Sequence, residues 1–162
     1  MDGKVSLLVD TNVWLDYFLA SRPGHESAFK FFFALSDKEA NLFYAATTAK
    51  DIFFIAGSIM KGDWKKEHGC LTEANSSAIN VMCWGITETM EEMATPVGVD
   101  ASDFWLARKY RSLHKDLEDN LVLAAAQRAK VDVLVTNDVN LIKHAPVPAM
   151  TPDDAIAYLY MG

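Results

Sequence analysis

Short, almost uninterrupted apolar runs are the feature that most restricts how this chain can fold. Each is bounded by polar residues or by residues that commonly begin helices. Such runs suit the strands of a parallel sheet covered on both faces, because neither side of the strand meets water. Two weaker runs carry a proline, which suits a sheet edge or a strand start. The expected strands are Val5–Val9, Leu42–Ala46 and Val133–Val135, with Pro96–Val99 and Pro146–Met150 as the weaker pair.

Helical patterns fill the gaps between these runs. Apolar residues recur at one-turn spacing in some segments, and others follow residues that cap helices well. Strands that alternate with helices predict a three-layer α/β/α sandwich around a central parallel sheet of four to five strands. The expected helical segments are 28–33, 49–60 after Thr47 or Thr48, 78–93, 101–110 after Asp100, 117–128, and a last helix that starts at Thr151-Pro152-Asp153-Asp154.

The chain has the size and composition of one ordinary domain. It has 162 residues, 51% of them hydrophobic, and its mean hydropathy is +0.04. No uncharged apolar run reaches the ~20 residues that cross a bilayer, and the first residues do not resemble a signal peptide. Neither Cys70 nor Cys83 lies in a metal-ligand spacing, which favours reduced, structural thiols. We therefore expect a single domain over residues 1–162, cytoplasmic and without a membrane anchor.

The net charge of −7 argues against a protein that holds nucleic acid by bulk electrostatics. A metal-dependent nuclease can still be acidic, because its centre must contain several carboxylates. Without the four aspartates considered next, the balance changes from −7 to −3. The acidity is therefore compatible with metal-dependent catalysis, but it disfavours tight binding of RNA without help from a cation.

Four aspartates occupy positions where parallel sheets bind ligands. Ligands of open parallel sheets bind outside the carboxyl ends of the strands. Asp10 directly follows the first expected strand and Asp138 follows the third. Asp51 lies one turn into the helix after the second strand, and Asp119 lies in the first turn of the helix that leads into the third. The four side chains could therefore converge at one edge of the sheet.

Four converging carboxylates would repel one another without a cation. Hard oxygen ligands suit Mg²⁺ or Mn²⁺, which also take up phosphate oxygens and can supply hydroxide near neutral pH. Metal-assisted hydrolysis of a phosphodiester is the chemistry that this arrangement permits. Each acid taken alone could instead be a helix cap, and Asp138 could serve a turn with Asn137 and Asn140. The combination of all four carries the interpretation.

The local sequences around these acids include an acid-Thr-Asn motif after the first strand and a Thr-Asn-Asp motif after the third. The segments are Leu8 to Asp16, Asp116 to Leu121, Thr136 to Asp138, Pro146 to Pro148 and Thr151 to Asp154. In their order and spacing they resemble the PIN domain, the fold of VapC-type toxins of bacterial and archaeal toxin–antitoxin systems. The likeness is strongest to a nucleic-acid-binding branch of that family, and it covers the whole chain.

This resemblance implies roles for individual residues. Asp10, Asp119 and Asp138 would be metal-binding carboxylates, and Thr136 would form hydrogen bonds in the same site. Many family members carry Glu in the helix after the second strand, whereas this chain offers Asp51. Because Asp-Ile is common there in the branch that this chain resembles, we expect Asp51 to keep its catalytic role. Its shorter side chain would then bond through water.

Three further polar residues are candidate supports. Asp116 and Asp119 are three residues apart and would be neighbours on a helix, whereas Glu118 points about 100° away from Asp119. Glu118 therefore ranks lower as a direct ligand. The amide of Asn12 could hold Asp10 in place, or Asn12 could cap a helix that begins at Val13; both alternatives stay open.

Other conspicuous residues favour structural interpretations. The histidines lie in no ligand spacing, which favours surface positions: His25, His68, His114 and His144. A group of phenylalanines at helical spacing favours core or dimer packing over base stacking: Phe29, Phe31, Phe32 and Phe33. A small basic cluster is interpreted as a solvated loop between two helices: Lys61, Lys65 and Lys66.

The leading hypothesis is a Mg²⁺- or Mn²⁺-dependent endoribonuclease that acts on RNA as the toxin of a toxin–antitoxin pair. The resemblance implies an antitoxin partner that inserts a segment into the acidic site, and a homodimer is common in the family. A non-catalytic PIN-like module that binds RNA or protein is the first alternative. A haloacid-dehalogenase-like phosphatase also begins with a strand that ends in Asp. That chemistry needs a second acid two residues later, where this chain has Asn12.

Overall fold

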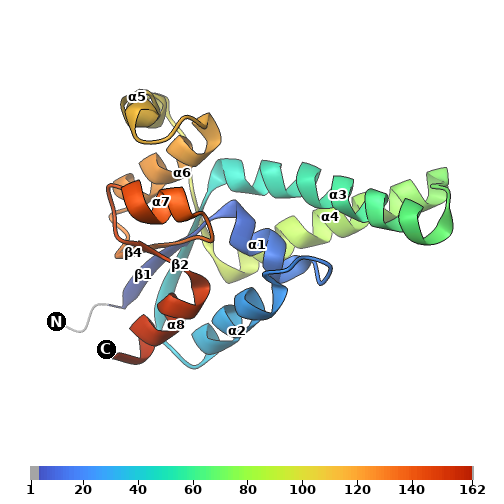
Figure 1. Ribbon diagram of the computed structural model, residues 1–162, viewed down its shortest axis with the longest axis horizontal. Coiled ribbons are helices and arrows are strands. Elements are labelled where there is room, and N and C mark those ends of the chain that lie inside the picture. The colour runs from blue at the N-terminus through green and yellow to red at the C-terminus, as the bar shows by residue number, and fades with distance from the viewer. Residues whose placement is uncertain (1–3, 162) are drawn as a thin grey trace.

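The computed structural model describes residues 4–161 and contains a five-stranded sheet (Figure 1). Every pair of neighbouring strands is parallel, and the strand order is β3-β2-β1-β4-β5. The strands are β1 (Val5–Val9), β2 (Ala40–Ala45), β3 (Thr95–Val97), β4 (Val133–Val135) and β5 (Ala149–Met150). This topology confirms the predicted parallel α/β class and places β1 at the centre of the sheet.

Helices cover both faces of the sheet and give the three predicted layers. Alternate residues of β1 enter different cores: Leu7 and Val9 pack with α1, α2, α3, α4 and α8, whereas Leu8 packs with α6 and α7. The helices are α1 (Thr11–Phe18), α2 (His25–Ser36), α3 (Ala46–His68), α4 (Glu73–Met93), α5 (Ala101–Lys109), α6 (Leu117–Arg128), α7 (Val139–His144) and α8 (Pro152–Met161), with the 3₁₀ turn η1 (Tyr110–Ser112) between α5 and α6.

The second strand and its helix differ from the sequence expectation. β2 ends at Ala45, and α3 begins at Ala46 with no side-chain cap, so neither Thr47 nor Thr48 is the N-cap. Thr48 is fully buried, and its hydroxyl accepts a hydrogen bond from the Thr11 hydroxyl at 3.3 Å. The helix also continues to His68. The lysine cluster at positions 61, 65 and 66 is therefore helical and not a loop.

The last strand and the helix before it also differ from expectation. β5 has two residues because the preceding segment contains Pro146 and Pro148, which lack the N–H needed for a strand ladder. The carbonyl of Pro148 still accepts a hydrogen bond from Leu134 at 2.8 Å. The short helix α7 was not predicted, because six residues are too few to show a helical period. The capping by Asp138 is its main local signal.

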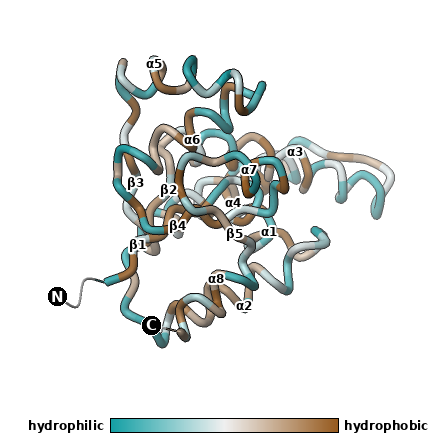
Figure 2. Tube along the Cα trace, turned by 60° about the vertical axis from the view of Figure 1, so that its left-hand side comes forward, coloured by the Kyte–Doolittle hydropathy of each residue, from teal (hydrophilic) through white to brown (hydrophobic). Residues whose placement is uncertain are grey.

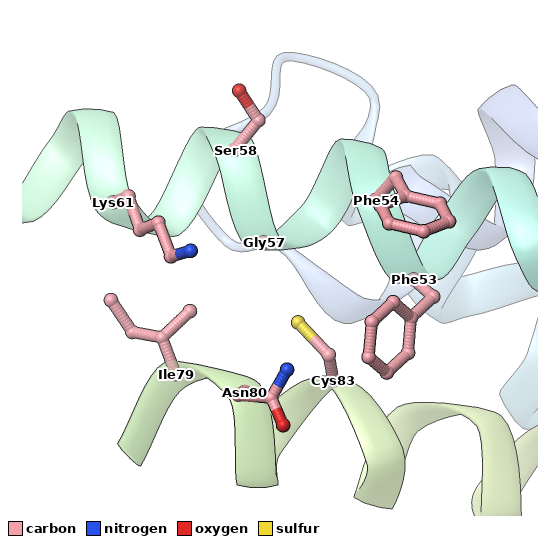
Figure 3. A pocket seen from close by; sticks show the side chains of 8 residues that line it. All are labelled: Phe53, Phe54, Gly57, Ser58, Lys61, Ile79, Asn80 and Cys83. Atoms are coloured by element: carbon pink, nitrogen blue, oxygen red, sulfur yellow. The ribbon is translucent and has the colours of Figure 1, made fainter. Parts of the chain in front are cut away.

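Helices α3 and α4 form a long hairpin that projects from the body of the molecule (Figure 1). The two helices approach closely where Gly57 faces Cys83 (Figure 3), since a Cβ at Gly57 would lie 3.2 Å from the Cys83 sulfur. Phe53 packs edge-on against Trp84. Neither helix, nor any other among residues 4–161, has the length and apolar character to span a bilayer.

Candidate metal centre

The centre of the sheet places two of the predicted acids side by side. β1 and β4 are hydrogen-bonded neighbours, and the backbone N–H of Asp10 donates to the carbonyl of Val135 at 3.0 Å. Asp10 and Asp138 therefore emerge from the same edge of the sheet, at the carboxyl ends of adjacent strands. Each is also the N-cap of the helix that follows it, α1 and α7 respectively. For Asp10 and Asp138 the structure therefore shows both a helix cap and a position at one edge of the sheet.

Asp10 is a buried carboxylate that interacts only with uncharged donors. Its side chain accepts hydrogen bonds from the Thr11 N–H at 2.7 Å, the Thr136 hydroxyl at 2.7 Å and the Asn12 amide at 2.9 Å. The residue is only 2% exposed. Burial raises the pKa of Asp10 above its usual value despite these hydrogen bonds, and the charge of Asp138 raises it further.

Asn12 and Thr136 connect the two strand ends. The Asn12 amide donates to Asp10 and also to the Thr136 hydroxyl at 3.2 Å, while its carbonyl accepts from the Asn137 N–H at 3.1 Å. The Thr136 hydroxyl accepts from the Asp138 N–H at 3.0 Å. Asn12 lies within α1 and does not cap it, since Asp10 is the N-cap. The structure therefore gives Asn12 the position needed to hold Asp10.

Asp119 and His114 complete a close group with Asp138. One His114 nitrogen, Nδ1, lies 3.2 Å from Oδ2 of Asp119, and Nε2 lies 4.0 Å from Oδ2 of Asp138. One ligand atom from each residue lies within 4.8 Å of the other two. Burial, together with the charges of Asp10, Asp116 and Asp138, raises the pKa of Asp119 to about 6, although His114 acts in the opposite direction. Three of the four predicted acids therefore interact electrostatically at one place.

The interpretation of His114 as a surface residue was wrong. Its side chain is only 15% exposed, and the amide of Asn120 fixes its backbone carbonyl at 2.8 Å. Its Nδ1 also lies 3.3 Å from the N–H of Asp116, so the tautomer decides whether Nδ1 donates to Asp119 or accepts from Asp116. No sequence spacing relates His114 to Asp138. Only the packing of the η1 turn brings them together.

Among the described residues Asp51 is not part of this close group, and it has a cation of its own. It is 8% exposed, and the Lys50 ammonium lies 2.9 Å from its Oδ1 and 3.7 Å from Oε1 of Glu118. Lys50 therefore bridges α3 to α6 and balances two acids. Glu118 is 59% exposed and directed toward this lysine.

Asp116 is the N-cap of α6 rather than a member of the helix. Its carboxylate accepts from the N–H groups of Glu118 at 2.8 Å and Asp119 at 3.3 Å. It thereby fixes the backbone that carries Asp119, and it is one of the charges that raise the pKa of that residue.

A cavity of about 240 Å³ gives access to Asp10 and Asp119. Its walls include the side chains of Asp10, Asn12, Asp116 and Asp119, together with apolar residues. Among residues 4–161, no Lys or Arg lies within 4.0 Å of the carboxylates of Asp10, Asp119 or Asp138. Clustered carboxylate oxygens that lack a cation from the protein fit Mg²⁺ or Mn²⁺, and the imidazole beside them is acceptable to Mn²⁺.

The sequence comparison decides the family. The PIN domain family matches residues 6–140, which is most of the chain. This protein belongs to the PIN domain family. No curated protein sequence matches the chain.

Solved structures share the fold at low sequence identity. VapBC2 from Rickettsia felis, bound to a promoter DNA fragment, matches with a TM-score of 0.63 and 9% identity over 91% of this chain and 98% of the other. A toxin–antitoxin complex from Klebsiella pneumoniae matches with a TM-score of 0.54 and 20% identity over 90% of this chain and 97% of the other. Mycobacterium tuberculosis VapC20, a toxin that cleaves the sarcin–ricin loop, matches with a TM-score of 0.54 and 11% identity over 79% of this chain and 86% of the other. These likenesses show that the fold is that of the PIN domain.

Proposed function

We propose that this PIN-domain protein is a Mg²⁺- or Mn²⁺-dependent endoribonuclease. The observation that carries the proposal is the group of carboxylates at the ends of β1 and β4, which among residues 4–161 has no Lys or Arg partner and only His114 beside it. Asp10 is buried without a cationic partner, and Asp119 has a pKa of about 6 because burial and neighbouring carboxylates disfavour its charge. Such a group is costly to maintain unless a cation neutralises it. Membership of the PIN family supports nuclease chemistry at this place.

In this proposal Asp10, Asp119 and Asp138 hold the ion. The ion would polarise the scissile phosphate and lower the pKa of a bound water toward neutrality. Asn12 and Thr136 orient the Asp10 carboxylate through hydrogen bonds at 2.9 and 2.7 Å. His114 can hold a proton at Nδ1 or Nε2 beside two of the carboxylates.

Two neighbouring acids have supporting roles. Asp51 would contribute its carboxylate from α3 through a water molecule, at the position where Lys50 now contacts it. Asp116 fixes the backbone of Asp119 as the N-cap of α6. Glu118 would keep Lys50 beside Asp51.

We extend the proposal to a toxin that is controlled by an antitoxin in the cytoplasm. Two of the structures with this fold are complexes of toxins with antitoxins. The acidic pocket and the net charge of −7 favour a partner segment that carries positive charge. Co-expression with a candidate antitoxin should protect cells from growth arrest, and the protection should require a basic residue of the partner.

Cleavage of total cellular RNA tests the nuclease proposal. The wild type should cut RNA with Mn²⁺ and not with EDTA, and Asp119→Asn should lose at least ~10²-fold because the variant lacks the charge of one ligand. Asp153→Asn is a matched control, since Asp153 also lies in the first turn of a helix but is exposed on α8. Equal activity in wild type and Asp119→Asn would exclude the assigned role of Asp119.

A non-catalytic PIN-like module is the second candidate, because Lys50 already neutralises Asp51. Thermal unfolding in EDTA and in Mn²⁺ separates the two candidates. An ion at ~100 times its Kd stabilises the native state by about 2.7 kcal/mol, which raises the Tm of a chain of this size by roughly 5–10 °C. A wild-type Tm that is unchanged by saturating Mn²⁺ would favour the non-catalytic module.

A further inference from the structure

Basic residues gather on one surface of this acidic protein. Four of the chain's 15 Lys and Arg residues occur in eight consecutive positions, Arg108, Lys109, Arg111 and Lys115. All four are exposed, and within residues 4–161 none of them lies within 4.0 Å of a carboxylate. In a protein of net charge −7, this group of cations without acidic partners suits a ligand that supplies negative charge.

Exposed aromatic rings accompany these cations on α5. Phe104 is 49% exposed and Trp105 is 52% exposed. Each aromatic residue lies one helical turn before a basic residue, since Arg108 and Lys109 follow them by four residues. The Lys109 ammonium lies 3.6 Å from the centroid of the Trp105 ring. Helix α5 lies at the periphery of the molecule, and hydrophobic and hydrophilic residues alternate along it (Figure 2).

This surface leads directly to the candidate metal centre. His114 lies between Arg111 and Lys115 in sequence, and its ring contacts Asp119. A hollow beside it is lined by Leu113, His114, Lys115, Asp116, Asn140 and His144. His114 therefore links this hollow to the carboxylate group, and Asp116 also lines the cavity that contains Asp10.

The connection between the two regions is fixed by buried contacts. Tyr110 is 8% exposed, and its carbonyl accepts hydrogen bonds from the N–H groups of Leu113 at 2.8 Å and His114 at 2.9 Å. The amide of Asn120, which is 2% exposed, donates to the His114 carbonyl at 2.8 Å. The basic turn is therefore held in one position relative to α6 and to Asp119.

We propose that α5 and the turn after it form the docking surface for a single-stranded RNA substrate. Bases stack on Phe104 and Trp105, and phosphates contact the four cations, so that the strand passes over His114 toward the carboxylates. Stacking rings combined with a basic surface are typical of proteins that bind single strands. Double-stranded RNA does not offer free base faces to such rings. This inference rests on the proposed nuclease function, because it gives that site its substrate.

A second basic cluster supplies a matched control. Lys61, Lys65 and Lys66 lie near the end of α3, on the projecting hairpin (Figure 1). There Lys66 pairs with Asp63 at 3.9 Å, and the ring of Trp64 stacks on His68. The two clusters carry comparable charge, but only the one near α5 adjoins the carboxylates.

Fluorescence anisotropy with a labelled single-stranded 12-nucleotide RNA of mixed sequence tests the proposal. Binding is measured in EDTA, which prevents metal-dependent cleavage, over a series of KCl concentrations. The variant Arg108→Gln/Lys109→Gln/Arg111→Gln should bind at least ~10-fold more weakly at low salt. Its salt dependence, the slope of log K against log [KCl], should fall by about 2, since each lost phosphate contact on a single strand removes about 0.7. Lys61→Gln/Lys65→Gln/Lys66→Gln should change affinity less than about twofold.

Trp105→Ala examines the stacking contribution separately. It should weaken binding by roughly tenfold and leave the salt dependence unchanged, because a ring displaces no counterions. Circular dichroism should show that all variants remain folded, since the substituted side chains are exposed, apart from the partly buried Lys61. Equal weakening by the two triple variants would overturn the proposal. The proposal would also be overturned, in favour of a protein interface, if Trp105→Ala kept its RNA affinity but sedimented with a smaller molecular mass than the wild type.

Failure of this inference and failure of the nuclease proposal give different results. If the wild type cuts RNA with Mn²⁺ but the α5 triple variant binds and cuts equally well, the docking surface is refuted and the nuclease remains. If binding depends on α5 but no RNA is cut with Mn²⁺, the docking surface is supported and the nuclease is refuted.

Discussion

Two buried aspartates, one at the start and one near the end of α1, differ in what balances their charge. Asp10 is 2% exposed and Asp16 is 4% exposed. Asp16 forms an ion pair with Arg22 at 2.6 Å and accepts a hydrogen bond from the Asn137 amide at 2.9 Å. Asp10 has no such cation and accepts only from uncharged groups. The two carboxylates are therefore buried to a similar extent, but of the two only Asp16 has a positively charged partner among residues 4–161.

The chain packs closely around Asp16. A Cβ at Gly24 would lie 2.1 Å from Oδ2 of Asp16, so only glycine lets the backbone pass at this distance. His25 also contacts the Asp16 carbonyl at 2.9 Å. A buried acid with its own cation is typical of structural ion pairs. A buried acid without one indicates a place for a cation from outside.

Asp10→Asn should produce the largest effect. RNA cleavage with Mn²⁺ should fall by at least ~10²-fold, because the variant lacks the charge of a ligand. The free energy of unfolding in EDTA should stay within about 1 kcal/mol of the wild type, since the lost acceptor is offset by relief of a buried charge. The two quantities are measured by gel assay and by urea unfolding. A large loss of stability in EDTA would make Asp10 a structural residue like Asp16.

Asp16→Asn should show the opposite pattern. It leaves the Arg22 guanidinium without its partner, and because that side chain is 29% exposed the cost should be about 2–3 kcal/mol rather than the full cost for a buried charge. The increase in Tm on adding Mn²⁺ should be kept. The double variant Asp16→Asn/Arg22→Gln should recover part of the lost stability in urea unfolding. Loss of the Mn²⁺ response in a variant that is still folded would contradict the separation of the two aspartates.

The sequence was sufficient to predict the sheet and the acids at its edge. Buried strands leave nearly continuous apolar runs, so the bounds of β1 and β4 match the expected segments. Because parallel strands present their carboxyl ends at one edge, the positions of Asp10 and Asp138 followed from the fold class. The family motifs added Asp119, whose helix start also carries a clear cap at Asp116.

The remaining parts of the site depend on packing between distant segments. His114 reaches Asp138 only because η1 and α6 fold the chain back over β4. The backbone at Gly24 also approaches the Asp16 carboxylate closely, which no periodic pattern reveals. Likewise, the contact of Lys50 with Glu118 joins two helices that are far apart in sequence. Local propensity and spacing contain no information about such contacts.

The pH dependence of stability should separate metal-free from metal-loaded protein. The folded protein keeps a proton on Asp119 up to about pH 6, whereas the unfolded chain loses it near its ordinary pKa of 3.8. A raised carboxyl pKa therefore makes the metal-free protein lose stability as the pH rises from about 4 to 6. With 28% of the side chain exposed, the loss attributable to Asp119 should be roughly 1–2 kcal/mol.

Urea unfolding in EDTA at pH 4.5 and pH 7 measures this loss, and Asp119→Asn isolates it from other titrating groups. The difference between wild type and variant should shrink when saturating Mn²⁺ is added at pH 7, because the ion replaces the proton. Identical pH profiles for wild type and Asp119→Asn would mean that the carboxylates do not repel one another as proposed.

Lys50→Met should give the smallest change. It decides whether Asp51 is half of a structural ion pair, like Asp16, or a carboxylate that acts on the ion, like Asp10. Lys50 is 61% exposed, so losing its contact with Asp51 should change the free energy of unfolding by no more than about 0.5 kcal/mol. Removing a positive charge next to the acidic group should strengthen Mn²⁺ binding about two- to threefold, as a screened charge near a divalent ion would. Calorimetric titration measures that affinity. If Mn²⁺ affinity is unchanged and stability falls by more than about 1 kcal/mol, Asp51 belongs with Asp16 as half of a structural pair. If Mn²⁺ binds more tightly and the free energy of unfolding is nearly constant, Asp51 belongs with Asp10. Removing Lys50 can strengthen Mn²⁺ binding in this way only if the Asp51 carboxylate contributes to the electrostatic field at the ion.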